Sequence, residues 1–178
     1  MGSLYTGYGD SGYTYCARMR AKVPKDHPVI EIMGTLDEAS SAIGLARSLL
    51  PKGSEAIDDV LKRMQRLLYR LASHISGFGE VGEDDVSWLE GVADEYYGEP
   101  LKDFILPGSP SAAAAIHLAR TVVRRLERRY ITAVRDGHLP KDPVVMKVIN
   151  RLSDALFAVA VCLQRKYGGG PEKAKASD

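Results

Sequence analysis

The chain is poor in cysteine and has no long apolar run. Its two cysteines, Cys16 and Cys162, lie far apart and in no metal-binding spacing, which favours a reduced, cytoplasmic protein. No apolar run approaches the ~18–20 residues of a membrane span, and the N-terminus lacks the charged-then-apolar pattern of a signal peptide. We therefore expect no membrane partner.

Neither sign of charge is in excess, because 24 Lys and Arg face 23 Asp and Glu. Such a balance creates no bulk field to attract nucleic acid. Side-chain amides are scarce, with Asn150 the single asparagine and Gln65 and Gln164 the two glutamines. Together with 26% charged residues, this composition leans towards a heat-adapted protein. The length of 178 residues suits one domain with a sizeable core.

Strand patterns are almost absent, whereas helical periodicity is strong. We expect helices over residues 31–50 (starting as early as Pro28), 54–77, 84–98, 111–137 and 142–168. The last is apolar over most of its circumference, which places it centrally or against another subunit. Short connections predict an all-α fold, a five-helix up-and-down bundle of the ferritin-like, four-helix-bundle type. Residues 1–168 would form one domain, and residues 169–178 a disordered tail.

The glycine-rich stretch GYGDSG, residues 7–12, matches the dinucleotide-binding pattern G-x-G-x-x-G. That fold requires a strand before the first glycine and a helix opening at the last. Only six residues precede Gly7, and no helical period follows Gly12. The pattern therefore does not indicate a dinucleotide fold. Glycines beside hydroxyls and backbone N–H groups can still bind phosphate.

An arginine-rich helix offers a second phosphate-binding element. Arg120, Arg124, Glu127 and Arg128 are spaced i, i+4, i+7 and i+8, which places them along one helix face. Two explanations are equally consistent with this helix alone. It is a solvated face with ion pairs, or it is an anion clamp, because the arginine fork suits phosphate.

Asn150 and Asp154 lie i, i+4 in the last helix. A buried structural hydrogen bond explains this asparagine about as well as a ligand contact does, because asparagine is a poor helix former. The four histidines have no metal-binding spacing, so we expect no metal bound by protein ligands alone. The residues taken together suggest a nucleotide-binding helical bundle, with the second substrate unnamed.

In order along the chain, the loop from Tyr5 to Thr14, VPKDHPVIE, GTLDEASSAIGLA, FILPGS, ARTVVRRLERR and NRLSD resemble the ATP:cob(I)alamin adenosyltransferases of the trimeric, propanediol-utilisation type. The match covers nearly the whole chain, from about Tyr5 to about Leu163. The resemblance implies a homotrimer of five-helix bundles with active sites between subunits. It implies transfer of the 5′-deoxyadenosyl group of ATP to the cobalt of cob(I)alamin, with Mg²⁺ accompanying ATP. A reductase that supplies Co(I) and an adenosylcobalamin-dependent mutase are the protein partners that this chemistry implies.

The resemblance also implies roles for particular residues. The N-terminal loop, about residues 5–26, would surround the ATP phosphates. Asp37 would pair with Arg120 across the subunit boundary, and Phe104 would lie under the corrin and exclude the lower axial ligand. Catalysis would depend on Asp37, Phe104, Arg120 and Arg124. The residues expected to bind ATP are Thr6, Gly9, Asp10, Thr14, Lys25, Arg124, Glu127, Arg128 and Asn150.

The N-terminal loop departs from the family pattern. The family's YTRTGD is replaced here by a sequence with Gly7 and Tyr8, and CARMR at residues 16–20 replaces a Gly-Gly pair. Arg18 or Arg20 could restore the missing positive charge, and Met19 is a further altered position of this loop. These departures support an alternative hypothesis, an ATP- or cobalamin-binding escort or sensor with little turnover.

Overall fold

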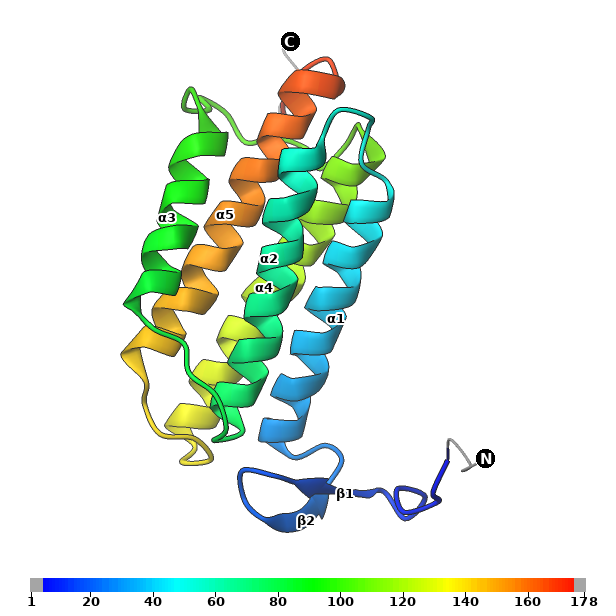
Figure 1. The fold of residues 1–178 in the computed structure, drawn as a ribbon, viewed down its shortest axis with the longest axis vertical. Helices are drawn as coiled ribbons and strands as arrows, with labels where there is room; N and C mark the ends of the chain where they lie inside the picture. Colours follow the sequence, from blue (N-terminus) through cyan, green and yellow to red (C-terminus); the bar gives the residue numbers. More distant parts are fainter. Residues whose placement is uncertain (1–4, 175–178) are drawn as a thin grey trace.

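The computed structural model describes residues 5–174, which form five long helices preceded by a small β-hairpin (Figure 1). The helices are α1 (Pro28–Ser48), α2 (Glu55–Ile75), α3 (Glu83–Tyr97), α4 (Ser111–Arg135) and α5 (Pro143–Tyr167). They alternate in direction along one bundle axis. The expected five-helix bundle is therefore confirmed, with the first helix starting at Pro28. In the part of the chain that the structure describes, no helix has the length and apolar character needed to cross a membrane.

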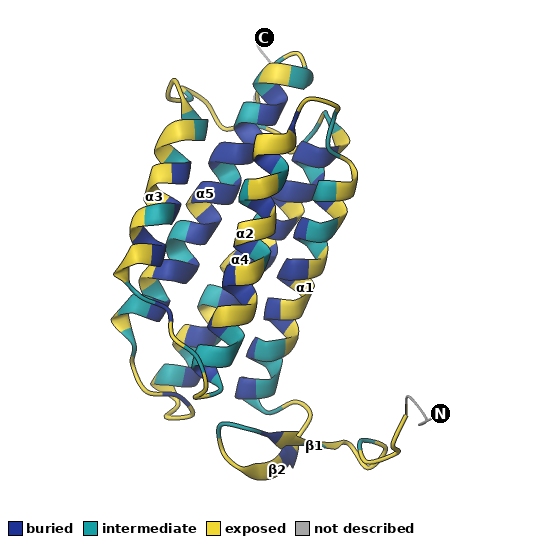
Figure 2. Ribbon diagram, viewed as in Figure 1, coloured by how far each residue is buried: buried dark blue, intermediate teal, exposed yellow. Residues whose placement is uncertain are grey.

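The helices pack around a core in which α5 is central (Figure 2). Helix α4 packs between α1 and α5, α2 packs on α1, and α3 packs on the outer side of α5. Leu152 and Leu156 of α5 are fully buried, and burying each such side chain contributes roughly 1.5–3 kcal/mol. The central position of α5 explains why its sequence is apolar around most of its circumference.

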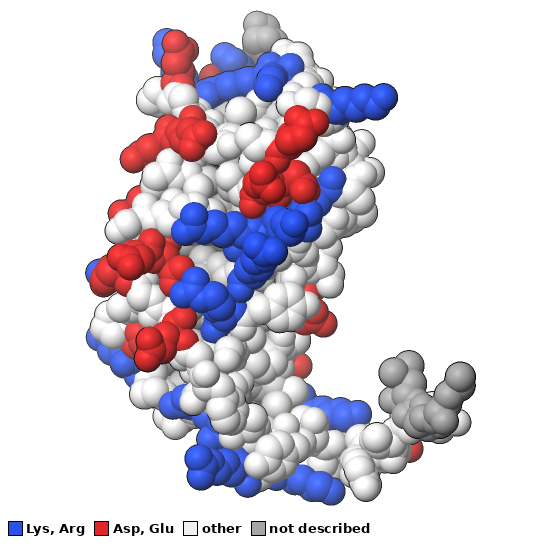
Figure 3. Space-filling model, viewed as in Figure 1, with Lys and Arg blue, Asp and Glu red and all other residues white. Residues whose placement is uncertain are grey.

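Basic side chains gather over α2 on one face of the molecule (Figure 3). Two of them tie α2 to α3. The Arg63 guanidinium carbon lies 4.0 Å from the centre of the Trp88 ring, and Arg70 is bonded to the Asp85 carboxylate at 2.8 Å. This part of the basic surface therefore stabilises the bundle.

The all-α expectation is wrong in one detail, the two-stranded hairpin before α1. Strand β1 (Tyr13–Cys16) pairs antiparallel with β2 (Ala21–Pro24). Cys16 and Val23 are buried against the bundle, and the Arg18 guanidinium donates to the Ile75 carbonyl at the end of α2, at 3.1 Å. Four-residue strands are too short to give a clear alternating pattern, which is why the sequence did not reveal them.

The chain beyond α5 also differs from expectation. We expected residues 169–178 to be disordered, and residues 175–178 lie outside the described residues. Residues 172–174 instead run antiparallel to the chain at Ile105. Backbone hydrogen bonds join Leu106 N–H to the Glu172 carbonyl and Ala174 N–H to the Phe104 carbonyl, each at 2.8 Å. We call residues 101–109 the Phe104 loop and residues 168–174 the C-terminal strap.

Candidate active site

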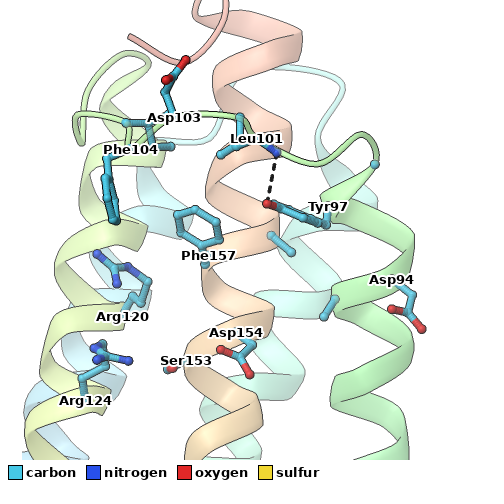
Figure 4. A pocket seen from close by; sticks show the side chains of 14 residues that line it. Asp94, Tyr97, Leu101, Asp103, Phe104, Arg120, Arg124, Ser153, Asp154 and Phe157 are labelled. Atoms are coloured by element: carbon cyan, nitrogen blue, oxygen red, sulfur yellow. Dashed lines mark hydrogen bonds between the residues drawn. The ribbon is translucent and has the colours of Figure 1, made fainter. Parts of the chain in front are cut away.

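A pocket of about 660 Å³ opens between α3, α4, α5 and the Phe104 loop. Its volume lies within the range of small-molecule sites. Figure 4 shows Arg120 and Arg124 projecting from α4 towards Phe157 and Asp154 of α5, with Phe104 above Arg120. The pocket thus combines aromatic rings with two guanidiniums.

Phe104 lies at the mouth of this pocket, with 88% of its surface exposed. The rings of Tyr97 and Phe157 lie 6.0 Å apart, centre to centre, within the same pocket. The Tyr97 hydroxyl accepts a hydrogen bond from Leu101 N–H at 3.3 Å. These contacts position an apolar wall, which suits a large planar or apolar ligand.

Helix α4 carries two rows of arginines with different surroundings. Arg125 and Arg129 form ion pairs with Glu38 and Glu31 of α1. In contrast, Arg120, Arg124 and Arg128 form no ion pair with any carboxylate of residues 5–174. The ion-pair explanation therefore applies to the first row, and the second row is available to bind an anion.

Arg120 is the most buried member of the second row. Burial, and then the repulsion of Arg124, lower the pKa of Arg120, although a guanidinium remains charged. Burial also raises the pKa of the Asp154 carboxyl, which lines the same pocket. Arg120 is thus partly withdrawn from solvent, whereas the Asp154 side chain remains 56% exposed.

Glu127 and Asn150, two of the expected ATP ligands, meet between α4 and α5. The Asn150 amide donates to the Glu127 carboxylate at 3.0 Å, and Arg151 donates to the Asn150 carbonyl oxygen at 2.8 Å. The Asn150 amide is therefore oriented by two neighbours. Glu127 lies on α4 between Arg124 and Arg128, so this contact brings Asn150 to the same helix.

The N-terminal loop lies at the opposite end of the bundle from the Phe104 loop (Figure 1). Thr14 and Lys25 line a second pocket, of about 460 Å³, with Arg129 and carboxylates of α1. The Lys25 ammonium reaches Gly9 so closely that a Cβ there would lie 2.9 Å from Nζ. The structure thus brings Gly9, Thr14 and Lys25 together.

Other predicted residues are not joined within one chain. Thr6 is exposed, and Asp10 contributes a backbone turn, its N–H donating to the Gly7 carbonyl at 3.1 Å. Asp37 lies on α1 beside a small groove that α1 forms with α2, whereas Arg120 faces the pocket between α4 and α5. Arg18 does not supply charge to the loop, because it is bonded to α2.

Comparisons with known proteins identify the family of this chain. The family described as cobalamin adenosyltransferase matches residues 4–163. The chain belongs to this family. The corrinoid adenosyltransferase MMAB of Mus musculus is 36% identical over 98% of this chain and 78% of its own length. That of Bacillus subtilis is 35% identical over 94% of this chain and 89% of its own length. The family gives corrinoid adenosyltransfer as the activity, which makes the protein a transferase, as the sequence motifs predicted.

A solved structure of the same family has the same fold. It is a phenylalanine-to-alanine variant of the PduO-type ATP:corrinoid adenosyltransferase from Lactobacillus reuteri, complexed with cobalamin and ATP. The TM-score is 0.86 at 29% identity, over 98% of this chain and 100% of that chain. The corrinoid adenosyltransferase PduO of Salmonella typhimurium is a longer relative, 34% identical over 89% of this chain. The match covers 48% of that relative, so the chain spans about half of its length.

Several residues that line the two pockets were not predicted from the sequence, among them Tyr97, Arg129 and Phe157. Phe157 follows Asn150 by seven residues and Asp154 by three, a spacing that places all three on one helix face. That spacing was a usable signal. Tyr97 ends a helix whose orientation the sequence does not give.

Within residues 5–174, no group of three or more His, Cys, Asp or Glu side chains is arranged to hold a metal ion.

Proposed function

We propose that the chain transfers the 5′-deoxyadenosyl group of ATP to cob(I)alamin, with the corrin held at the pocket beneath Phe104. The observation that carries this proposal is the row of arginines, Arg120, Arg124 and Arg128, which lacks carboxylate partners among residues 5–174. It begins in the aromatic pocket and continues along α4. An apolar ligand and a polyphosphate can therefore meet there.

The chemistry asks little acid–base work of the protein. The Co(I) centre supplies the electron pair for a new bond to the ribose C5′ atom, and the C5′–O bond breaks. The triphosphate leaves with that bonding pair, so no proton transfer is required. The tasks left to the side chains are to align the two substrates and to stabilise the leaving charge. Arg124 and Arg128 suit the second task, with Mg²⁺ entering on ATP.

The active site would be completed between subunits of a homotrimer. Residues 120 to 128 of α4 span about 12 Å along the helix axis at 1.5 Å per residue. The N-terminal loop, by contrast, lies at the end of the bundle away from the Phe104 loop, so within one chain it is remote from the pocket that holds Arg120 and Phe104. Tyr5 and Tyr8 of that loop are 84% and 80% exposed. Residues 5–12, which are mostly exposed, could therefore bind the ATP phosphates on a neighbouring copy. At the same subunit boundary Asp37 would pair with Arg120.

Phe104 would act on cobalamin and not on ATP. Its exposed ring at the pocket mouth would occupy the position beneath the corrin where the lower axial ligand of cobalt would otherwise lie. Removal of that ligand makes Co(II) easier to reduce, so Phe104 would assist the step before adenosyl transfer. The expected role of this residue is thus distinct from that of the arginines.

The alternative function, an escort or sensor that binds without turnover, draws on the altered loop. Gly7 has a φ of +70°, a conformation that other residues adopt only at a cost. The family pattern has a basic residue at this position, so the sequence departs from the pattern here. A binding protein would retain affinity for ATP and cobalamin yet form no adenosylcobalamin.

One anaerobic experiment separates the two functions. Purified protein is mixed with chemically reduced cob(I)alamin and Mg-ATP, and adenosylcobalamin is followed by visible absorbance. Product that disappears in Arg124→Ala supports the enzyme. Binding of both ligands without product would overturn the proposed function and support the escort.

A further inference from the structure

The loop that carries Phe104 is held from outside the pocket. The exposed Phe104 ring makes little packing contact of its own. Backbone hydrogen bonds from Leu106 N–H to the Glu172 carbonyl and from Ala174 N–H to the Phe104 carbonyl lie on either side of Ile105. Lys173 adds an ion pair with Asp103 at 2.9 Å. The C-terminal strap thus fixes the backbone at Phe104 itself.

Gln164 connects this strap to the bundle interior. Its side chain is only 1% exposed, and its amide N–H donates to the Leu106 carbonyl at 3.1 Å. Its backbone carbonyl accepts from Gly168 and Gly170 N–H, at 3.0 and 2.9 Å, where the chain leaves α5. One residue therefore anchors both the Phe104 loop and the start of the strap.

His117 completes the anchor from α4. The Gln164 amide nitrogen must face the Leu106 carbonyl, so its oxygen faces His117 Nε2 at 3.2 Å. Only a proton on Nε2 allows that bond. Burial, the largest cause, lowers the pKa of His117, which keeps the ring neutral. His117 is 2% exposed, so the surrounding core holds its ring in place and the ring in turn orients the Gln164 side chain.

Gly168 brings the strap into direct contact with the end of the Phe104 loop. A Cβ at this position would collide with the Ser109 carbonyl oxygen and lie 2.8 Å from its carbon. The φ of Gly168 is −110°, so glycine is needed for the close approach and not for backbone freedom. Loop and strap are therefore fitted to one another at both ends.

We propose that Gln164 and the C-terminal strap are positioning elements of the corrinoid site, which hold the Phe104 loop over the pocket. This inference rests on the proposed function, because it assigns to the strap the placement of Phe104 beneath the corrin. None of these residues touches the reacting atoms. Loss of their contacts is expected to slow the reaction that starts from Co(II) and to leave ATP binding unchanged.

The first test uses Ala174→Pro, which removes the N–H that donates to Phe104, with Ala174→Ser as the matched control that keeps it. The strap is exposed at Ala174, so the bundle core is untouched. Hydrogen exchange of the Leu106 amide in the unliganded protein is expected to accelerate roughly five- to tenfold, in line with the loss of one hydrogen bond. The serine variant is expected to exchange as the unaltered protein does.

A second pair of variants tests the anchor. Gln164→Met keeps the side-chain volume and removes the hydrogen bonds to His117 and to the Leu106 carbonyl. Gly168→Ala adds a Cβ that would collide with the Ser109 carbonyl and push the strap away from it. Gly91→Ala on α3 is the control, because a Cβ there meets nothing within 4 Å. Both test variants are expected to speed Leu106 exchange, and the control is not.

The functional readout compares adenosylation that starts from Co(II), with a reductant present, with adenosylation from pre-formed Co(I). For the test variants we expect slower turnover from Co(II) and an unchanged KM for ATP. The electron paramagnetic resonance spectrum of their bound Co(II) is expected to show the lower ligand coordinated again. Equal slowing from Co(I), or unchanged Leu106 exchange, would overturn the positioning role. An unaltered protein without turnover, whose variants still exchange faster, would overturn the proposed function and leave the strap's hold on the loop supported.

Discussion

The Arg120 guanidinium carbon lies 5.7 Å from the centre of the Phe157 ring, and its Nε is buried without a hydrogen-bond partner among residues 5–174. A cation over an aromatic face gains roughly 0.5–2 kcal/mol. Arg120 is partly buried, and this burial disfavours its charge. An anion from outside residues 5–174, either a carboxylate of a second copy or a phosphate, would therefore stabilise Arg120.

Charge reversal tests whether that anion is Asp37 of a second copy. Arg120→Asp or Asp37→Arg alone is expected to dissociate the proposed trimer, because two like charges would then meet at the proposed subunit boundary. The double variant restores the pair in reversed order and is expected to reassociate. Sedimentation velocity measures the oligomeric state. Single variants that remain trimeric would show that Arg120 pairs with something else.

Arg124→Ala is expected to lower turnover on the order of 10²–10³, by analogy with the loss of one donor to a developing negative charge. Arg125→Ala, one residue further along α4, is the control. Its partner is Glu38, and the pair is partly exposed, so it contributes only ~0–1 kcal/mol. Steady-state kinetics with pre-formed Co(I) compares the two. Equal losses would mean that the two arginine rows do not have separate roles.

Phe104→Ala is expected to spare ATP affinity and to slow the reaction that begins from Co(II). The reason is that, in the proposed function, the ring would exclude the lower ligand of cobalt and would take no part in nucleotide binding. Turnover assays from Co(II) and from Co(I), run side by side, measure the difference. If the variant is slowed equally from both oxidation states, Phe104 has another role.

The helices were predictable because each has a long apolar period. Leu61, Met64, Leu68 and Leu71 of α2 repeat at three- and four-residue spacing and are all buried. The spacing on α4 likewise placed Arg120, Arg124 and Arg128 along one side of a helix, and the structure has all three within α4. Within a helix, spacing determines which face a residue lies on, and that information is local.

What depends on contacts between distant segments could not be predicted. The pairing of Leu106 with Glu172 joins a loop to residues that have no periodicity of their own. A glycine- and lysine-rich tail has the composition of a disordered segment, and only its partner gives it a conformation. Likewise, spacing showed arginines on one face, but it did not show that Arg129 pairs with Glu31 while Arg124 pairs with no carboxylate of residues 5–174.

Asp142 makes a pH-dependent contribution to stability at the start of α5. Its carboxylate accepts from Val144 and Val145 N–H, at 2.9 and 3.1 Å, and from His74 Nε2 at 3.0 Å. Burial by itself would raise the pKa of Asp142, but these hydrogen bonds lower it overall. The folded pKa is therefore below the unfolded value of about 3.9.

The sign of the effect follows from proton binding. At acid pH the unfolded chain binds more protons than the folded one, so the contribution of Asp142 is present above about pH 4 and is lost as the pH falls through the folded pKa. Asp142→Asn keeps an acceptor for the helix N–H groups but does not titrate. Asp142→Ala removes the cap and is expected to cost about 1 kcal/mol near neutral pH.

Urea unfolding of the three proteins between about pH 3 and about pH 7 measures these terms, since the linkage slope appears only where the two states differ in bound protons. The unaltered protein is expected to exceed Asp142→Asn in stability near neutrality, and the gap is expected to close at the acid end. A gap that stays constant with pH would mean that the carboxylate's charge plays no part. The contribution of this position would then come from its hydrogen bonds to the helix N–H groups and not from its ionisation.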